Sequence, residues 1–475
     1  MTTSFNRLNR ALFKDIRFWL LLFFVVRLIG ITNPPLESGH NWRQTLTNMV
    51  ARNFYEDKAD IRFPTIDIAG EKSGVMTSEF PAYNYLIYGV SKLFGFNHWH
   101  GRWINLIIST IGLFYFYQLL AKLINRDIAL YATLITLASL WFAYSRKIMP
   151  DTFSVSLVFI GLYAAYAYLS GGKWFHLVLF FGFTTLGVLS KIPALSLCAG
   201  LVIVPWIKEV KRARIIPIVL AGLLGLSFVW LWYFYWLPHV YATHDYQLFF
   251  PKSLRQGFQE ITTVLPDLFE KFYFSSLNSF VAFSCFLLGL FFLVKRGNRL
   301  LQLALLSISI VFGFFILKTG SVFPTHSYYT VPFAPVMAIV AAYFLLQLPK
   351  KIGVVLLGVI LIEGIANQQH DFFLRDSELY KLELASTMER VIPTDDLVVI
   401  NGGTTPQNIY FAHRKGWAVR NSEASNPGFV DSLAQLGAKY LIVDKHQPSM
   451  SELRYDVVFK SEHYDVYVLD SLIVN

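Results

Sequence analysis

Residues 208–236 read KEVKRARIIPIVLAGLLGLSFVWLWYFYW, a basic stretch followed by 22 residues that carry no charge. A helix of about 20 apolar residues spans the hydrocarbon layer of a membrane, and Lys and Arg gather at the cytoplasmic ends of such helices. The stretch therefore predicts a transmembrane helix over 215–236 whose amino end lies in the cytoplasm.

The same alternation of apolar runs and short connectors extends over most of the chain. Of the 475 residues, 55% are hydrophobic and 15% are charged, too apolar a composition for an ordinary soluble fold. We predict an all-α polytopic membrane protein with about eleven transmembrane helices. The expected crossings lie near residues 18–31, 103–122, 127–145, 152–169, 174–189, 192–207, 215–236, 276–294, 300–317, 330–348 and 352–366.

Basic connectors indicate the orientation. If the amino end is cytoplasmic, every basic cluster between helices falls on the cytoplasmic side, and an odd number of crossings places the carboxyl end outside. We expect the inner membrane of a bacterium. The basic residues that give the formal charge of +10 lie beside the membrane segments, and this distribution argues against nucleic-acid binding. The clusters are Lys122 with Arg126, Lys173, 208–214, 295–299 and 350–351.

Two long loops are expected on the outer side of the membrane. They cover residues 33–102 and 238–275. Within them, residues 81–96 and 253–274 are too short or too polar to cross a membrane. These two segments predict helices that lie along the outer membrane surface.

The end of the chain has the composition of a soluble protein, with alternating strands and helices. We therefore predict two domains, a transmembrane domain over 1–367 and a small extracytoplasmic α/β domain over 368–475. The expected strands are 397–401, 440–444, 455–459 and 464–469, and the expected helices are 378–391, 406–414 and 429–436.

Five polar clusters stand at the outer ends of the predicted helices. Ionisable groups cost free energy in or near the membrane, so their gathering on one face predicts a functional site there. The clusters are residues 37–44 (ESGHNWRQ), 78–81 (SEFP), 145–151 (SRKIMPD), 190–193 (SKIP) and 325–329 (THSYY).

The order of these clusters resembles the membrane glycosyltransferases of the GT-C superfamily. The resemblance is to the glycosyltransferase family 39-like group, which includes protein mannosyltransferases and aminoarabinose transferases, and it covers about residues 17–366. It implies an enzyme that moves a hexose or pentose from a polyprenyl phosphate to a lipid, glycan or protein acceptor on the extracytoplasmic face. The motifs that carry it are His40–Gln44 with residues 51–55, Glu79-Phe80-Pro81, Pro150-Asp151, and Tyr328-Tyr329 followed by Pro332 and Pro335.

Displacing a lipid phosphate from a sugar needs a base for the acceptor hydroxyl and cations for the departing phosphate. The resemblance implies an acid in the first outer loop, where Glu37 matches although the family more often has Asp, and His40 is its rival. Asp151 matches the acid that closes the second outer loop. The candidates for the phosphate are Arg43, Lys191 and His326, and those for the sugar or substrate are Trp42, Glu79, Tyr83, Tyr328 and Tyr329.

Several of these residues have a structural alternative. For Glu37, the equal alternative is a solvated residue in a polar loop. For Asp151, the alternative is the cap of a helix that begins at Thr152. Lys191 stands beside Pro193, where a structural role at a kink is an even alternative. Arg146 and Lys147 are more readily interpreted as interfacial anchors than as ligands.

No metal site is predicted, because no His or carboxylate pair has ligand spacing on one helix. A Mg²⁺ or Mn²⁺ ion that bridges Glu37, Asp151 and a phosphate remains an alternative. A lipid-linked glycan transporter or flippase is the alternative from another class, but transporters carry polar groups at the midplane and internal repeats. A glycan ligase stays open as well.

Overall fold

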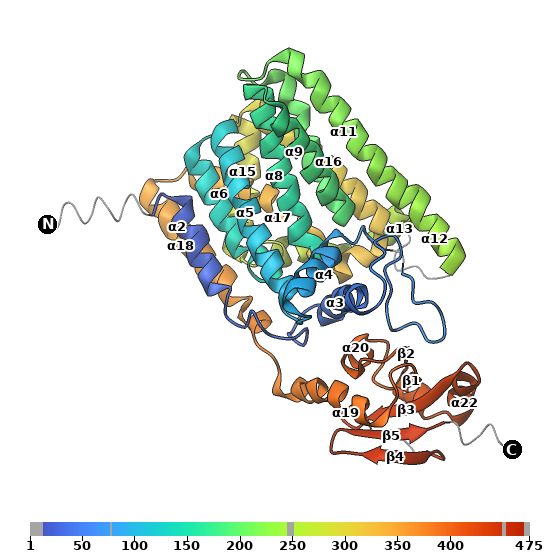
Figure 1. Cartoon of the computed structure of the whole chain (residues 1–475). Coiled ribbons are helices and arrows are strands. Elements are labelled where there is room, and N and C mark those ends of the chain that lie inside the picture. Colours follow the sequence, from blue (N-terminus) through green and yellow to red (C-terminus); the bar gives the residue numbers. More distant parts are fainter. Residues whose placement is uncertain (1–12, 77, 245–250, 449–452, 470–475) are drawn as a thin grey trace.

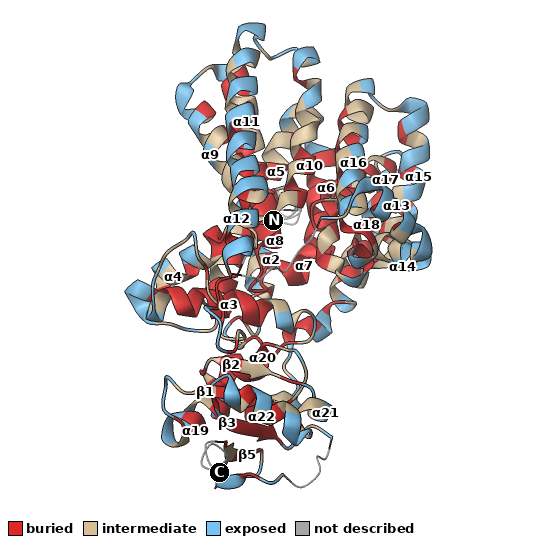
Figure 2. Ribbon diagram, turned by 90° about the vertical axis from the view of Figure 1, so that its right-hand side faces the viewer, coloured by how far each residue is buried: buried red, intermediate tan, exposed pale blue. Residues whose placement is uncertain are grey.

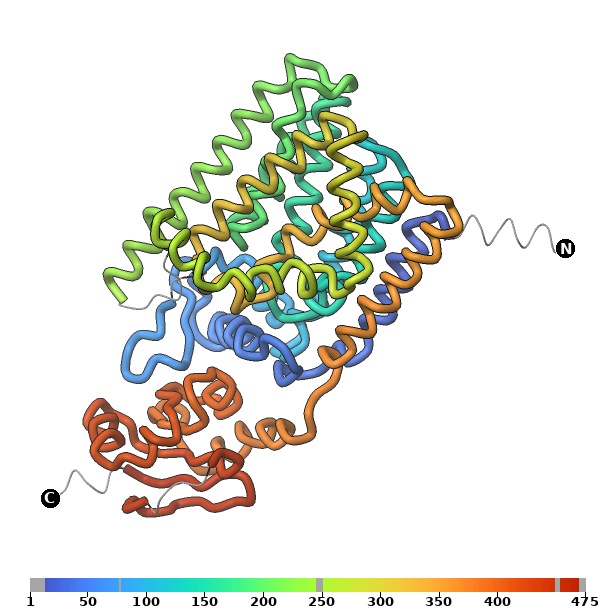
Figure 3. Tube along the Cα trace, turned by 180° about the vertical axis from the view of Figure 1, so that it is seen from behind, coloured from blue at the N-terminus to red at the C-terminus, as the bar shows by residue number. Residues whose placement is uncertain are grey.

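The computed structural model describes residues 13–76, 78–244, 251–448 and 453–469, so the basic start of the chain before Phe13 lies outside the described residues. A bundle of long helices forms one part of the molecule, and a sheet with short helices forms the other (Figure 1). After the last long helix, the chain passes through a loop and short helical segments before it enters the sheet (Figure 3).

The helices of the larger part alternate with short connectors, as the apolar runs predict. They are α2 (Ile16–Val26), α3 (Asn41–Glu56), α4 (Ala82–Phe94), α5 (His100–Leu123), α6 (Arg126–Ala138), α7 (Trp141–Tyr144), α8 (Pro150–Gly171), α9 (Trp174–Ser190), α10 (Leu195–Cys198), α11 (Ile215–Trp230), α12 (Leu237–His244), α13 (Leu254–Thr263), α14 (Leu265–Glu270), α15 (Phe280–Arg296), α16 (Arg299–Thr319), α17 (Ala334–Leu345) and α18 (Lys350–Ala366). Shorter 3₁₀ and π segments are η1 (Ile192–Ala194), η2 (Ala199–Trp206), η3 (Arg212–Arg214), η4 (Leu231–Trp236), η5 (Lys271–Ser275), η6 (Gly320–Thr325) and η7 (Ser327–Thr330).

A helix covers each predicted crossing, but several are short or broken. Within the described residues, four helices are long and apolar enough to cross a membrane, namely α5, α8, Arg212–His244 and Arg299–Thr325. The number becomes six if each of two bent helix pairs is one crossing. The predicted helix over 127–145 ends at Ala138 and resumes as α7, and the predicted helix over 192–207 is largely 3₁₀ around Pro205. The count of about eleven stays a prediction.

Apolar residues face outward along the long helices. Figure 2 shows exposed residues along α11 and α15, and Leu220, Leu223 and Val294 are among the large exposed side chains. Such an apolar surface suits lipid rather than water. The buried side chains gather instead along α7, α8 and α17.

Helices are present in both segments that the sequence assigned to the membrane surface, as α4 and as the pair α13 and α14, and their position along that surface stays a prediction. The sequence did not predict α3, because its residues are mostly polar and lack an apolar stripe. The tertiary fold explains it: α3 packs against α4 on one side and α20 on the other, and its residues from Gln44 to Phe54 are buried.

The carboxyl-terminal part holds one five-stranded sheet of order β2-β1-β3-β5-β4. The pairs β1–β2 and β1–β3 are parallel, whereas β3–β5 and β4–β5 are antiparallel. The strands are β1 (Leu397–Ile400), β2 (Gly416–Ala418), β3 (Ala438–Asp444), β4 (Asp456–Lys460) and β5 (Tyr464–Val468). The helical segments are η8 (Gln369–Phe372), η9 (Asp376–Glu383), α19 (Leu384–Val391), α20 (Gln407–Ala412), α21 (Asn421–Ala424) and α22 (Pro427–Gln435).

The predicted strands and helices of this part are therefore present, together with the short strand β2, which the pattern missed. Three residues are too few for a visible alternation of apolar and polar side chains. The boundary between two domains at residue 367 stays a prediction.

Candidate active site

The site begins at the amino end of α8. Pro150 is the first residue of this helix, where its fixed φ and missing N–H are well tolerated. Asp151 follows in the first turn and is only 3% exposed. The N-cap residue is Met149, which makes no capping side-chain bond, so the alternative that Asp151 caps a helix beginning at Thr152 is wrong. The helix begins earlier because Pro150 is a good first residue.

Four charged side chains from four segments meet here, and we call them the quartet: Arg43, Glu79, Asp151 and Lys191. Arg43 forms an ion pair with Glu79. Lys191 Nζ lies 3.5 Å from Glu79 Oε1 and 3.7 Å from Asp151 Oδ1. All four side chains are largely buried. Burial lowers the pKa of the Lys191 ammonium, and the nearby Asp151 carboxylate opposes that shift.

The position of Lys191 follows from its local structure. It ends α9 and precedes η1 in extended backbone, so its side chain leaves the helix axis at the point where Pro193 starts the next segment. Its Nζ also lies 5.3 Å from the centre of the Tyr328 ring and 5.9 Å from that of Tyr329. Both the structural and the ligand interpretation of Lys191 fit this geometry.

The two carboxylate oxygens of Asp151 differ in their contacts. Oδ1 faces Lys191, whereas Oδ2 is buried and has no hydrogen-bond partner within the described part of the chain. A buried carboxylate oxygen without a partner is costly, and such an atom in a native structure is a candidate for contact with a ligand.

His40 and His326 lie beside the quartet. The His40 ring centre lies 4.9 Å from that of Tyr328 and 6.5 Å from that of His326. His40 Nε2 lies 3.1 Å from Ser327 Oγ, which in turn lies 2.7 Å from the Tyr144 hydroxyl. Burial, aided by Lys147, lowers the pKa of His40 to about 3, and burial also lowers the pKa of His326. A lowered pKa favours the uncharged ring, which can still take part in hydrogen bonds.

Glu37 belongs to a separate buried ion-pair cluster. Arg102 Nη1 lies 2.6 Å from Glu37 Oε2, and Arg146 Nη2 lies 3.2 Å from Oε1. Asn33 Nδ2 donates to Oε1 at 3.1 Å. Glu37 is fully buried, so the alternative that it is a solvated loop residue is wrong. The loop packs without water because Arg102, at the start of α5, also donates hydrogen bonds to the carbonyls of Asn33 and Pro34.

Arg146 and Lys147 are not interfacial anchors, because both are fully buried. Lys147 Nζ donates to the Gly39 carbonyl at 2.9 Å and to Asp371 Oδ1 at 2.8 Å. Residues 37–39 therefore fold over the turn between α7 and α8 and replace water as partners of these cations. Burial lowers the pKa of Arg146 to about 10, against the opposing effect of Glu37.

Sequence reasoning missed three residues that hold the site together: Arg102, Asn105 and Asp371. Asn105 Nδ2 donates to the carbonyls of Tyr144 and Lys147 at 3.0 and 2.8 Å and so fixes the turn that precedes Asp151. A buried amide or charge within an apolar run is a usable signal, since such groups are costly there. Asp371 gave no signal, as it follows the last predicted crossing.

The remaining predicted residues divide into two groups. Tyr328 and Tyr329 lie at the quartet, as described above. Trp42 is 38% exposed, and its indole N–H donates to the Thr404 carbonyl at 3.4 Å, so it faces the carboxyl-terminal part. Tyr83 is buried and its hydroxyl donates to the Gly101 carbonyl at 2.6 Å. Trp42, Tyr83 and Glu37 thus have their contacts outside the quartet.

A metal ion bridging Glu37 and Asp151 is not favoured by this arrangement, because both Glu37 oxygens already have arginine partners. In the ranges that the structure describes, no group of three His, Cys, Asp or Glu side chains could hold a metal ion. That the protein works without a metal stays a prediction.

Comparison with known proteins gives one family-model match. Residues 78–234 match the family model described as dolichyl-phosphate-mannose-protein mannosyltransferase. This range includes Glu79, Asp151 and Lys191. Comparison with curated protein sequences gives no match.

Several solved structures share the fold. One is ArnT from Cupriavidus metallidurans bound to undecaprenyl phosphate, with 12% identity, a TM-score of 0.61, and 95% of this chain and 98% of that chain covered. Another is the archaeal oligosaccharyltransferase AglB from Archaeoglobus fulgidus in complex with an inhibitory peptide and a dolichol-phosphate, with 13% identity, a TM-score of 0.53, and 90% and 69% covered. The arabinofuranosyltransferase AftD from Mycobacteria has 12% identity, a TM-score of 0.54, and 95% and 41% covered.

Residues 78–234, about a third of the chain, thus match a mannosyltransferase family model, and the chain shares its fold with the solved ArnT, AglB and AftD structures. The resemblance to the glycosyltransferase family 39-like group is confirmed for residues 78–234.

Proposed function

We propose that this protein transfers a sugar from a polyprenyl phosphate to a hydroxyl of a lipid, glycan or protein acceptor. The observation that carries the proposal is Oδ2 of Asp151, which is buried beside the cations of the quartet and has no hydrogen-bond partner among the described residues. Asp151 would supply the base, and the cations Arg43 and Lys191 would bind the phosphate within a few ångströms of it. This transfer needs both groups close together.

In the proposed reaction, Asp151 Oδ2 accepts the proton of the acceptor hydroxyl while that oxygen attacks the anomeric carbon. The bond between this carbon and the phosphate oxygen breaks, and polyprenyl phosphate leaves with the electron pair. Attack opposite the leaving group inverts the anomeric centre. Arg43 and Lys191 stabilise the charge that develops on the phosphate, in a site where burial strengthens the interaction.

Glu79 has a different role in this proposal from that of Asp151. It accepts from both cations of the quartet in the absence of donor. A donor phosphate brings its own negative charge to the same cations, so Glu79 positions Arg43 and Lys191 rather than acting as the base. Tyr328 and Tyr329 present aromatic faces beside Lys191, where a sugar ring could stack.

Two features of the solved relatives support a lipid-linked donor. The ArnT structure is bound to undecaprenyl phosphate, and the AglB structure holds a dolichol-phosphate. The proposal also places the quartet and residues 368–475 on the extracytoplasmic face, with the amino end in the cytoplasm, in accord with the basic connectors.

The test is sugar transfer from a panel of radiolabelled polyprenyl-phosphate donors by purified protein in detergent. We expect Asp151→Asn to lower the rate at least about 100-fold, as loss of a general base does. We expect Arg43→Gln and Lys191→Gln to raise the KM for the donor as well. Asp127→Asn, a change of an exposed acid in the first turn of α6, is the control and should transfer at the wild-type rate.

A folded Asp151→Asn protein with wild-type activity would refute the assignment of the base and move it to His40. If the wild type transfers no sugar from any donor in the panel to any acceptor, the proposed function is wrong.

A further inference from the structure

An unassigned cavity of about 490 Å³ lies between α5, α8, α16, α17 and η2. Its lining is mainly aliphatic, with Leu120, Leu162, Leu201, Leu301, Leu305 and Ile308 among the contributing residues. Its size falls within the range of about 300–1,000 Å³ that is typical of small-ligand sites.

The cavity extends to the end of α5 and α8 that lies opposite to the quartet, and its inner lining reaches Phe159 of α8 and Pro335 in the first turn of α17. Arg102 and Asn105, which hold the site, stand in the first turns of α5, whereas Leu119, Leu120 and Leu123 near its last turn line the cavity. In the same way, α8 starts beside Asp151 and its far end contributes Leu169. Because α5 has 24 residues, it is about 36 Å long. The cavity mouth is therefore roughly a membrane thickness away from the reacting groups.

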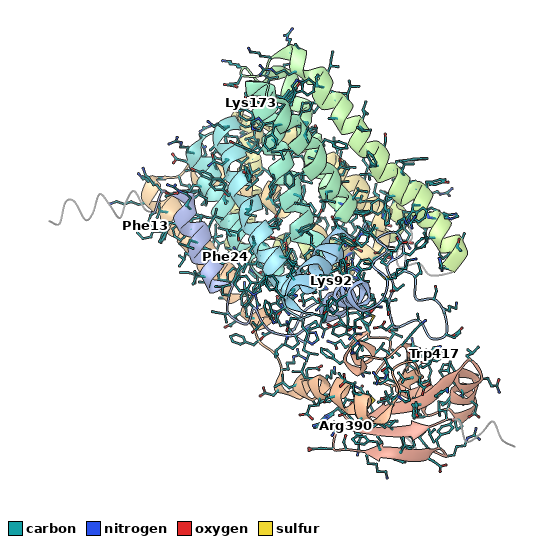
Figure 4. The ribbon with its side chains drawn as sticks, viewed as in Figure 1. Phe13, Phe24, Lys92, Lys173, Arg390 and Trp417 are labelled. Carbon is teal, nitrogen blue, oxygen red and sulfur yellow. The ribbon has the colours of Figure 1, made fainter. Side chains whose placement is uncertain are left out.

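The mouth of the cavity is polar and basic. Lys122 and Lys208 line it together with Glu209 and Asn298. Both lysines are exposed. Figure 4 shows Lys173 at this end of the bundle, far from Trp417 and Arg390 in the carboxyl-terminal part.

We propose that this cavity binds an anionic phospholipid, with an acyl chain among the leucines and the phosphate at Lys122 and Lys208. The lining requires an apolar chain, and the excess of cations at the mouth selects a net negative headgroup over a zwitterionic one. Trp206, which is 58% exposed, also lines the cavity, as suits an aromatic residue at a membrane–water boundary.

This site is independent of the proposed transfer reaction, because none of the quartet lines the cavity. A bound lipid would contact α5, α8, α16 and α17 at once. It would therefore hold together the ends of α5 and α8, whose other ends carry Arg102 and Asp151.

The test is native mass spectrometry of the full-length protein after removal of lipid and titration with phosphatidylglycerol or phosphatidylcholine. We expect tighter binding of phosphatidylglycerol, and an affinity about thirtyfold lower in Lys122→Gln/Lys208→Gln, since each lysine near an anionic headgroup contributes about fivefold. The control is Lys295→Gln/Arg296→Gln, which removes two charges at the same end from residues that do not line the cavity. It should change the affinity less than about threefold.

A second variant tests the cavity itself. A Cβ at Gly200 would lie 3.3 Å from the Ile308 side chain, so Gly200→Leu fills space inside the cavity without changing charge. We expect it to abolish retention of phosphatidylglycerol. Equal binding of the two phospholipids by the wild type, or unchanged phosphatidylglycerol binding in the double lysine variant, would overturn the proposal. Stoichiometric displacement of phosphatidylglycerol by polyprenyl phosphate would overturn it too, because the cavity would then hold the donor chain.

Discussion

Two clusters of buried charges differ in how their acids are paired. The side chains of the quartet are largely buried and those of the Glu37 cluster are fully buried, and a buried charge is tolerated only when it is paired. In the Glu37 cluster both carboxylate oxygens have cationic partners, whereas in the quartet Asp151 keeps one oxygen without a partner among the described residues. The carboxylate of Glu37 is thus fully paired, whereas that of Asp151 keeps one oxygen for the role that we propose.

The first prediction concerns Glu37. Glu37→Gln leaves Arg102 and Arg146 buried without a counter-charge and should lower the free energy of unfolding by about 3–5 kcal/mol. Chemical unfolding in detergent measures it. Glu56→Gln, where the acid is about one-third exposed, is the matched control and should cost less than about 1 kcal/mol. A Glu37→Gln protein that is as stable as the wild type but inactive would instead make Glu37 a catalytic residue.

At the scale of elements, small residues let the central helices approach closely. A Cβ at Gly112 of α5 would lie 2.3 Å from Ser156 Cβ of α8, and one at Gly161 of α8 would lie 2.5 Å from the Thr184 side chain of α9. Close packing through glycine is common between membrane helices because lipid gives them no hydrophobic drive to associate. These contacts set the spacing of the helix ends that carry Arg102 and Asp151.

The second prediction follows from this packing. Gly112→Ala should push α5 from α8 and lower the free energy of unfolding by about 1–3 kcal/mol, the usual cost of overpacking. A Cβ at Gly313 of α16 would meet no described atom within 4 Å. Gly313→Ala should therefore raise stability by up to about 1 kcal/mol through helix propensity alone. Thermal unfolding of the two variants in the same detergent makes the comparison, and equal midpoints would contradict it.

At the scale of the whole molecule, α3 joins the helical bundle to the carboxyl-terminal part. Arg52 of α3 donates to the Tyr410 carbonyl at 2.8 Å and to Asp67 Oδ2 at 2.6 Å, and its guanidinium lies 4.5 Å from the centre of the Tyr410 ring. His98 Nδ1 lies 2.7 Å from the Tyr410 hydroxyl. The residues around Tyr410 therefore attach α20 to both the first outer loop and the start of α5.

The third prediction tests this attachment. Arg52→Met removes both hydrogen bonds and leaves Asp67 without its main cation, so the carboxyl-terminal part should detach more readily. We expect trypsin to cut at the exposed Arg375 several times faster than in the wild type. The control is Arg62→Met, which breaks an exposed pair with Asp60 and should leave the cleavage rate unchanged. Equal rates for the three proteins would show that other contacts carry the attachment.

Features that depend on neighbouring residues could be predicted from the amino-acid sequence. Long apolar runs predicted the helices, basic connectors predicted an orientation, and alternating residues predicted four of the five strands. The sequence also identified Arg43, Glu79, Asp151 and Lys191, because polar groups at the ends of apolar helices stand out and their order resembles a known family.

Only the tertiary structure shows which of these groups contact one another. Glu37 and Arg102 are 65 positions apart, and Lys147 and Asp371 are 224 apart. No local pattern encodes which partner a side chain finds at such separations. Whether a charge is solvated, paired or left with a free oxygen depends on which segments pack around it. For this reason Glu37 and Asp151 were equivalent candidates for the base in the sequence. In the fold, both oxygens of Glu37 are paired, whereas one oxygen of Asp151 has no partner among the described residues.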